Sequence, residues 1–525
     1  MSPLHNPNAV QAIYSPQALS RMRGNIFIEA LPRALSDAEV LECLSLQPDF
    51  CAEQRQWENH ERVQQVKSLA NFMVPLDRHL ALARALDTML REGYVGRGPR
   101  SKEFVARLQN SYSLQKEGKT FAQASDTIGS QDSAALIGVP GMGKSTTVRR
   151  WLAQYPRVIV HDDVDVVQVT YLHVDMSSDG VSVKALAIAL ISQLDRLLPQ
   201  HEYHKLYLQS TGRTSTEALI HIAARLLNIH HVGLIVADEV QNLAGSAKGA
   251  QTVMTELVTM CNALNVPVLF IGTNKASKVL GVDVRSARRA IGCFGSWGQM
   301  PRYDSGALNP SSSNDCSEWA DFVQVLWTHQ WVREPLPLTK DMLDYLYSRT
   351  QGIIDLVIKL FAIAQVRAIL YGEETLSERL FEQVYLEDFK LLHGAIDAMA
   401  GGDSKAYEKF ADIKPLDLEG QVQQHQAGAR MQIIRARSVK PREPGFTEAL
   451  ATGLMAVGFN SGDAVCLAKK AEDDGQAKTP LDALVLIAKE QRSHSSRTSS
   501  KKNSATRKVL YPDFSSRPAD YRRAL

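Results

Sequence analysis

Short apolar runs alternate with amphipathic patterns through the middle of the chain. Buried strands are predicted where aliphatic residues follow one another with little interruption, at 134–137, 166–174, 233–237 and 267–271. Between these runs, apolar residues recur at helical spacing at 146–155, 183–198 and 249–264. An alternation of strands and helices predicts an α/β fold, in which a parallel sheet carries helices on its faces.

Helical patterns without strands flank this central part. On the N-terminal side, Ser36 and Glu39 have the spacing of a capping box, and 76–92 predicts an amphipathic helix that stops at Gly93. On the C-terminal side, the polar loop 303–316 is followed by a predicted helical lid. The helical patterns of the lid cover 317–331, 339–349, 353–371 and 376–385.

Two basic stretches have no apolar face. The glycine-rich loop 94–102 either contacts nucleotide or nucleic acid or is a solvated turn. The tail 491–525 is rich in Ser, Lys and Arg, and its composition predicts disorder. Such a tail binds acidic partners or DNA phosphates, or only solubilises the chain. Helices are predicted before it, at 447–458 and 480–490.

The chain is long enough for several domains. Its 525 residues exceed what one core usually organises, and 44% apolar with 22% charged residues is typical of a globular protein. The patterns divide it into an N-terminal extension, an α/β core, a helical lid, a mostly helical C-terminal region and a basic tail. These are 1–115, 116–302, 303–392, 393–490 and 491–525.

Charge and cysteine content exclude some classes of protein. The net charge of +2 favours no partner by itself. The six cysteines include no C-x-x-C pair, which argues against a zinc site or a disulfide framework and favours a reducing cytosol. We find neither a secretory signal nor a run of about 18 apolar residues, so a cytoplasmic protein without a membrane span is expected.

The stretch from Gly138 to Ser145 has the pattern G-x-x-x-x-G-K-[ST] of a phosphate-binding loop. It stands between a predicted strand and a predicted helix, which an incidental glycine-rich turn would not require. We expect Lys144 to contact the β- and γ-phosphates of ATP and Ser145 to bind Mg²⁺. The residues expected at the nucleotide are Gly138, Pro140, Gly141, Met142, Gly143, Lys144, Ser145 and Thr146.

An acidic pair follows the predicted strand 233–237. Asp238, at the carboxyl end of that strand, is expected to hold Mg²⁺ together with Ser145. Glu239 is expected to polarise the attacking water as general base, which favours a hydrolase over a kinase. The alternative interpretation of the pair is a helix cap.

Polar and basic residues follow the last predicted strand. Thr273 or Asn274 is the candidate sensor of the γ-phosphate, although Gly-Thr-Asn is also ordinary turn chemistry. Further on, Arg285, Arg288 and Arg289 form a cluster. We expect Arg288 and Arg289, ahead of Arg285, to reach the nucleotide of a neighbouring protomer as catalytic groups. The alternatives are a solvated helix face and a DNA-facing patch.

These motifs, in this order, resemble the AAA+ class of ATPases. Over about residues 25–390 the chain more specifically resembles the TnsC-type transposition regulators of Tn7-like transposons. The chain departs from the family at Asn274, where the family has proline. It departs from many ring ATPases of the wider class in having Asp355 near the place where they carry a sensing arginine. The likeness rests on Asn25, 27–32, 93–97, 238–239, 271–273, 275–276, 285–289, Asp355, Val357 and 359–361.

The resemblance implies a specific activity. Proteins of this kind assemble on double-stranded DNA as ATP-bound rings or filaments and link a target-selector protein to the transposase subunits. It implies a homo-oligomer, as a hexamer, heptamer or filament, and a DNA-binding ATPase in the bacterial cytoplasm, associated with the nucleoid. The N-terminal extension is the expected docking region for the target selector, and ATP hydrolysis disassembles the complex.

Two other functions fit the motifs. One is a ring motor of the helicase or clamp-loader kind, for which we find no accessory helicase motif. The other is a signalling NTPase scaffold that binds no DNA. Both share the expected ATP and Mg²⁺ site.

Overall fold

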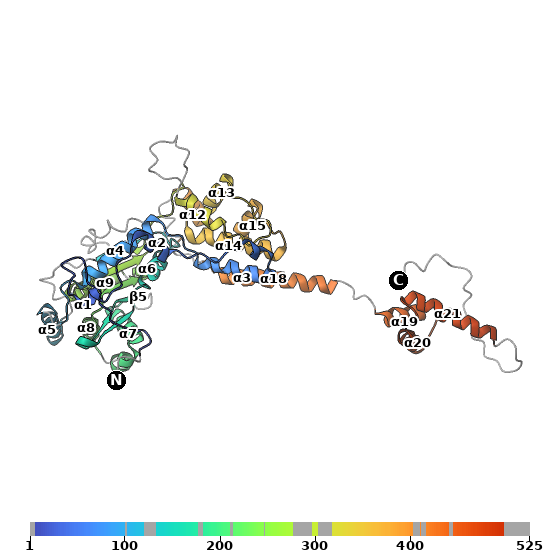
Figure 1. Ribbon diagram of the computed structural model, residues 1–525, viewed down its shortest axis with the longest axis horizontal. Coiled ribbons are helices and arrows are strands. Elements are labelled where there is room, and N and C mark those ends of the chain that lie inside the picture. Colours follow the sequence, from blue (N-terminus) through green and yellow to red (C-terminus); the bar gives the residue numbers. More distant parts are fainter. Residues whose placement is uncertain are drawn as a thin grey trace. The chain divides into compact units, whose positions relative to one another are not determined.

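The computed structural model describes residues 6–99, 102–119, 133–176, 182–209, 214–245, 247–276, 297–302, 318–402, 410, 416–439 and 445–497. The chain divides into two compact units, residues 1–429 and 430–525. Figure 1 labels the elements of both units.

A four-stranded parallel sheet forms the centre of the first unit. Its strands stand in the order β2 (Ser133–Ile137), β7 (Val268–Gly272), β6 (Leu234–Asp238) and β5 (Tyr171–Asp175). Because all four run in the same direction, the segments that follow β2, β6 and β7 emerge at one edge of the sheet. The predicted α/β class with an AAA+ P-loop core is confirmed.

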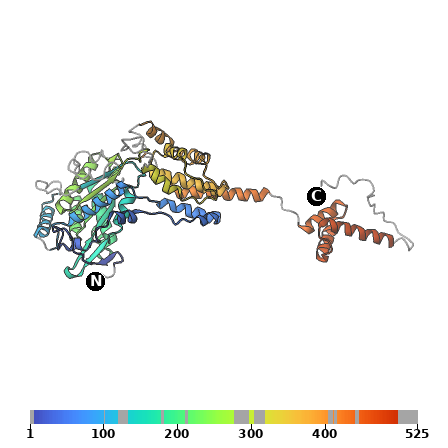
Figure 2. The same cartoon turned by 45° about the horizontal axis from the view of Figure 1, so that its top comes forward.

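Helices cover both faces of this sheet (Figures 1 and 2). Alternate residues of each strand point to opposite faces, so Leu136 and Val236 join one apolar cluster while Ala135 and Ile235 join the other. The first cluster includes residues of α4 and α6, and the second includes residues of α7, α8 and α9. These helices are α4 (Asp77–Tyr94), α6 (Lys144–Leu152), α7 (Val183–Leu197), α8 (Thr216–Ile229) and α9 (Ala247–Leu264).

The prediction of one strand over 166–174 is wrong. It divides at the buried Thr170 into β4 (Val166–Val169) and β5, which belong to different sheets. β4 pairs with β3 (Val158–His161), and β3 pairs with β1 (Ala9–Gln11). The β-branched pattern of the sequence continues through the division and gives no sign of it. The break depends on the distant strands with which β4 and β5 pair.

Gly93 does not end its helix as predicted. Helix α4 continues through Gly93 to Tyr94. A Cβ atom at position 93 would lie 2.6 Å from Cδ of Pro267, so the glycine permits close packing of α4 against the segment before β7.

The basic loop that follows α4 is partly internal. Tyr94 is fully buried and donates from Oη to the carbonyl of His231 at 3.0 Å. Arg97 is 2% exposed and donates from Nη2 to the carbonyl of Val232 at 2.8 Å. Both sequence interpretations, nucleic-acid contact and solvated turn, are therefore wrong for these two residues.

The predicted helical lid is present. Its longest helix, α14, is almost entirely apolar and buried, and the N-terminal helix α3 packs against it. Arg62 of α3, with no exposed surface, forms an ion pair at 2.7 Å with Glu374 of the lid. The lid helices are α12 (Glu318–Trp327), α13 (Lys340–Thr350), α14 (Ile354–Tyr371), α15 (Glu378–Asp388) and α16 (His393–Ala400).

The N-terminal segment contacts both the α/β core and the lid. Helices α2 and α4 pack against α6, whereas α3 and the short helix η3 pack against α14. Ser36 and Glu39 form the predicted capping box at the start of α2. The bounds are α1 (Ile26–Glu29), α2 (Asp37–Leu44), α3 (Asn59–Lys67), η3 (Ser68–Asn71) and α5 (Lys102–Glu117).

The second unit contains a small helical bundle. Its core is built from leucines and alanines, among them Leu450, Leu454, Ala464 and Ala468. Helix α21 runs through Arg497, past the position where disorder is predicted to begin; 498–525 lie outside the described residues. The helices are α19 (Phe446–Ala456), α20 (Ser461–Asp474) and α21 (Pro480–Arg497), and α18 (Leu418–Val439) precedes them. In the described part of the chain, no helix has the length and apolar character needed to cross a bilayer.

Candidate nucleotide-binding site

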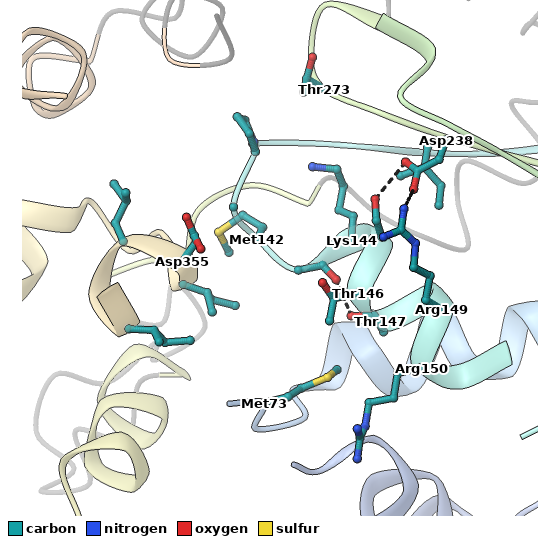
Figure 3. A pocket seen from close by; sticks show the side chains of 18 of the residues that line it. Met73, Met142, Lys144, Thr146, Thr147, Arg149, Arg150, Asp238, Thr273 and Asp355 are labelled. Atoms are coloured by element: carbon teal, nitrogen blue, oxygen red, sulfur yellow. Dashed lines mark hydrogen bonds and ion pairs between the residues drawn. The ribbon is translucent and has the colours of Figure 1, made fainter. Parts of the chain in front are cut away.

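A cavity of about 1160 Å³ opens at the carboxyl edge of the sheet. It is bounded by the phosphate loop, the segments that follow β6 and β7, the start of α14 and the N-terminal residues 70–74. Figure 3 shows the loop with Lys144 between Asp238 on one side and Asp355 on the other.

The phosphate loop has the backbone that its glycines allow. Gly141 and Gly143 have φ of +79° and +77°, a left-handed conformation that favours glycine, and α6 begins immediately afterwards. Of the eight residues expected at the nucleotide, all but Gly138 line the cavity. Gly138 instead lies against Trp297, whose carbonyl oxygen would be 2.1 Å from a Cβ atom at position 138.

Lys144 is turned back onto its own loop. Its ammonium donates to the carbonyls of Gly138 at 3.1 Å and Val139 at 2.8 Å, and the residue is 7% exposed. Burial lowers the pKa of Lys144 to about 8, although Glu239 and Asp238 favour the charged form. A bound phosphate would offer this ammonium stronger acceptors than the carbonyls.

Asp238 is the most enclosed charge of the site, with 1% of its surface exposed. Its Oδ1 accepts hydrogen bonds from Ser145 Oγ and from the backbone N–H of Glu239, both at 2.9 Å. Its Oδ2 lies 3.1 Å from His173 Nε2 and 3.4 Å from Arg149 Nη2. Burial raises the pKa of Asp238, but the hydrogen bonds from His173 and Ser145 outweigh it, so the pKa stays below its ordinary value.

The group around Asp238 contains the atoms that could hold a cation. Ser145 and Asp238 offer a hydroxyl and a carboxylate, the oxygen donors that Mg²⁺ prefers. His173, Asp175 and Asp238 also bring one ligand atom each to within 4.8 Å of one another. Arg149 already pairs with Asp175 at 3.6 Å and with Asp238 at 3.4 Å, which offsets part of the charge of the two carboxylates.

Glu239 stands in an unusual backbone conformation. Its φ of +57° is left-handed, which is uncommon for a residue other than glycine and typical of functional positions. Burial, and then the nearby Asp238, raise the pKa of Glu239. Its carboxylate accepts a hydrogen bond from the side-chain amide of Gln241, a residue that sequence reasoning missed.

Thr273, one of the two candidate sensors, lines the cavity, whereas Asn274 is not among the described residues that line it. Thr273 is 8% exposed, and its Oγ1 has no hydrogen-bond partner among the described residues. Its backbone N–H donates to Gln241 Oε1 at 3.0 Å. A buried hydroxyl without a partner is costly, which points to a ligand in the cavity.

In the part of the chain that the structure describes, one backbone hydrogen bond joins the lid to the phosphate loop. The N–H of Asp355, at the start of α14, donates to the carbonyl of Gly141 at 3.0 Å. The carboxylate of Asp355 accepts from Lys359 one turn later, at 2.7 Å. An acidic residue therefore stands beside the loop, near the place where a sensing arginine is usual in similar ATPases.

Apolar side chains form part of the cavity wall. Leu46 and Met73 exchange backbone hydrogen bonds of 2.9 and 2.8 Å and bring two distant N-terminal segments together at this wall. Leu392 and Phe410 line it from the lid side. No motif marks these positions, so sequence reasoning did not find them.

The arginine cluster lies outside the described residues. Residues 277–296, which include Arg285, Arg288 and Arg289, are not described, and neither is the polar loop 303–316. Their expected roles stay predictions.

Comparisons with known proteins agree with the P-loop architecture. Residues 127–280 match a family of AAA domains, AAA_22. No curated protein sequence matches the chain. The match covers the part of the chain that holds the phosphate loop, Asp238, Glu239 and Thr273.

Several solved structures are similar in part. A Walker-type ATPase of Pyrococcus abyssi is 13% identical, with a TM-score of 0.30 over 58% of this chain and 77% of that one. The ORC1 protein of Aeropyrum pernix in complex with DNA is 13% identical, with a TM-score of 0.30 over 61% and 83%. Cdc6p from Pyrobaculum aerophilum is 15% identical, with a TM-score of 0.29 over 66% and 89%. At these TM-scores the likeness decides nothing about ligands or partners.

Proposed function

We propose that the cavity binds ATP with Mg²⁺ and hydrolyses it. The observation that carries this proposal is the hydrogen bond of 2.9 Å between Ser145 of the phosphate loop and Asp238 at the end of β6. It joins two sequence motifs that lie far apart in the chain, in the arrangement that Mg²⁺-dependent P-loop NTPases require.

Each polar group then has a role. Lys144 and the loop N–H groups bind the phosphates, and Ser145 with Asp238 holds Mg²⁺. Glu239 takes the proton of the attacking water; its raised pKa brings it closer to the working pH of a base. Thr273, with its unpaired hydroxyl, contacts the γ-phosphate. Asn274 beside it remains the second sensor candidate.

The size and lining of the cavity support a nucleotide as ligand. Its volume of about 1160 Å³ is at the upper end of the range for small-molecule sites. The charged loop lines one part of the cavity, and apolar side chains such as Met73 and Leu392 line another part, which suits a base.

We further propose that this ATPase regulates DNA transposition. The support is the TnsC-type pattern of residues over about 25–390. In this proposal the protein assembles on duplex DNA as a ring or filament and joins a target selector to the transposase. Arg288 and Arg289 complete the ATP site of a neighbouring protomer, and hydrolysis releases the assembly.

Duplex DNA with ATP or a non-hydrolysable analogue tests the assembly. We expect rings or filaments on DNA in electron micrographs, and ATP hydrolysis that duplex DNA stimulates without strand separation. A helicase would unwind the duplex. An NTPase scaffold would retain no duplex in a filter-binding assay, and that result would rule out the transposition proposal while leaving the ATPase intact.

A mixing experiment tests the arginines. Protein with Arg288→Ala and Arg289→Ala is combined with Glu239→Gln protein, each nearly inactive alone. If the arginines act between protomers, some interfaces pair an intact Glu239 with intact arginines, and part of the ATPase activity returns. If mixed assemblies form and no activity returns, the arginines do not act in this way.

A further inference from the structure

Gln241 joins the two strand ends that carry the proposed chemistry. It lies in the 3₁₀ helix η8 (Val240–Gly245), which directly follows β6 and Glu239. Its Oε1 accepts the backbone N–H of Thr273 at 3.0 Å, and its Nε2 donates to Glu239 Oε2. Since a backbone N–H can only donate, the amide oxygen must face Thr273 and the amide NH₂ must face Glu239.

The fold makes room for this bridge. β6 and β7 are neighbours in the sheet, so Glu239 and Thr273 emerge side by side although they are distant in sequence. A Cβ atom at Gly272 would lie 3.0 Å from Gln241 Oε1, so the glycine before Thr273 leaves space for the amide. Thr273 lines the cavity, and its hydroxyl has no hydrogen-bond partner among the described residues.

We propose that Gln241 is a positioning residue for hydrolysis, which holds the carboxylate of Glu239 and couples it to Thr273. This inference rests on the proposed ATPase activity. A neutral amide fixes a carboxylate without supplying the positive charge that would weaken it as a base. When Thr273 contacts the γ-phosphate, the same amide transmits any movement of the β7 end to Glu239.

A second amide in the same helix, which lines the same cavity but bonds away from Glu239 and Thr273, is available for comparison. Asn242 donates from Nδ2 to the carbonyl of Met176 at 2.8 Å, on the side of β5. Asn242→Leu therefore removes an amide from η8 and leaves the bridge between Glu239 and Thr273 in place.

The first test separates binding from chemistry. Gln241→Met keeps the length of the side chain and loses both hydrogen bonds. We expect the single-turnover rate of ATP hydrolysis to fall by about 30-fold, less than the roughly 10²–10⁴-fold that a general base itself contributes, while the ATP Kd changes less than about twofold. Asn242→Leu should keep the rate. Equal losses in both variants, or a loss of ATP binding with an unchanged rate, would overturn the proposal.

The second test asks whether Gln241 acts through Glu239. In a Glu239→Gln background, Gln241→Met should cause no further loss of the residual rate, because the carboxylate that it positions is gone. A further loss of similar size would contradict the inference. If Gln241→Met does not fold, Gln241→Glu serves instead: it keeps an acceptor for Thr273 and removes the donor to Glu239, so full activity would contradict the inference. A wild-type protein that binds ATP and never hydrolyses it would refute the proposed function instead.

Discussion

The two sides of the nucleotide cavity are built differently. On the sheet side, hydrogen bonds connect Lys144, Ser145, Asp238, Glu239 and Thr273 to fixed partners, and most of these groups are buried. On the lid side, among the described residues, one backbone hydrogen bond from Asp355 to Gly141 and apolar contacts close the cavity. In the proposed function, this difference means that the sheet side carries the chemistry, whereas the lid side adjusts how tightly the nucleotide is held.

The largest effect is expected on the sheet side. Lys144→Ala removes the only charge that the loop itself brings to the β- and γ-phosphates. A charge-assisted hydrogen bond contributes about 3 kcal/mol, so ATP affinity should fall by about 100-fold or more. A fluorescence titration with a labelled ATP analogue measures this. Unchanged affinity would mean that the nucleotide does not bind at the loop.

The contact between the two sides can be broken at Gly141. Gly141→Ala places a side chain at a φ of +79°, with its Cβ 3.0 Å from Cβ of Asp355 and 3.1 Å from Ile353. The backbone strain costs about 1–2 kcal/mol, and displacement of α14 adds to it, so ATP affinity should fall by about 10-fold.

Gly372 offers a matched control at the other end of α14. It has a φ of +80°, and a Cβ atom there meets nothing within 4 Å. Gly372→Ala should lower the thermal stability through the same backbone strain and leave ATP affinity unchanged. Equal ATP affinities of the two variants would show that the lid contact has no role in binding.

The contrast between the sheet side and the lid side also separates the features that the sequence predicts from those that it does not. The strands β2, β6 and β7 follow from uninterrupted aliphatic runs, and Lys144 with Asp238 follows from residues adjacent to those runs. These features are local in the sequence. The break at Thr170 was missed because partner strands, rather than the residues of the run, decide it.

The missed parts of the site all depend on distant contacts. Met73 reaches the cavity only because it pairs with Leu46, and Gln241 reaches Thr273 only because β6 and β7 are neighbours. One signal was available: an amide two residues after an acidic pair stands near enough to contact the second carboxylate. The lid contact at Gly141 has no comparable signal.

A smaller effect on the sheet side should depend on pH. Burial places the pKa of Lys144 near 8 before nucleotide binds, and phosphate requires the charged form. Binding should therefore take up a proton above pH 8, and ATP affinity should fall by up to about 10-fold per pH unit there. Calorimetry in buffers of different ionisation enthalpy measures the uptake. No proton uptake between pH 8 and 9 would contradict the depressed pKa.

The lowered pKa of Lys144 also determines how the free energy of unfolding changes with pH. The unfolded chain binds a proton at Lys144 up to its ordinary pKa of 10.5, whereas the folded chain releases it near 8. Between these values the unfolded state holds more protons, so this residue makes the nucleotide-free protein more stable as pH rises through the interval. Saturating ATP should remove the trend between these values, because the nucleotide-bound protein keeps Lys144 charged, as the unfolded chain does.

The smallest effect is expected from the charge on the lid side. Asp355 places a partly exposed carboxylate next to Gly141, where it repels the triphosphate, and its ion pair with Lys359 at 2.7 Å offsets part of that repulsion. Asp355→Asn keeps the backbone hydrogen bond, removes the repulsion and releases Lys359 from its carboxylate. Screened by solvent, this change contributes about 0.7 kcal/mol, so ATP should bind about threefold more tightly at low salt and less so at high salt. Glu378→Gln, an exposed carboxylate at the start of α15, is the control that should leave affinity unchanged. Weaker binding by Asp355→Asn would instead show that the carboxylate stabilises the closed lid, and the lid side would then be as fixed as the sheet side.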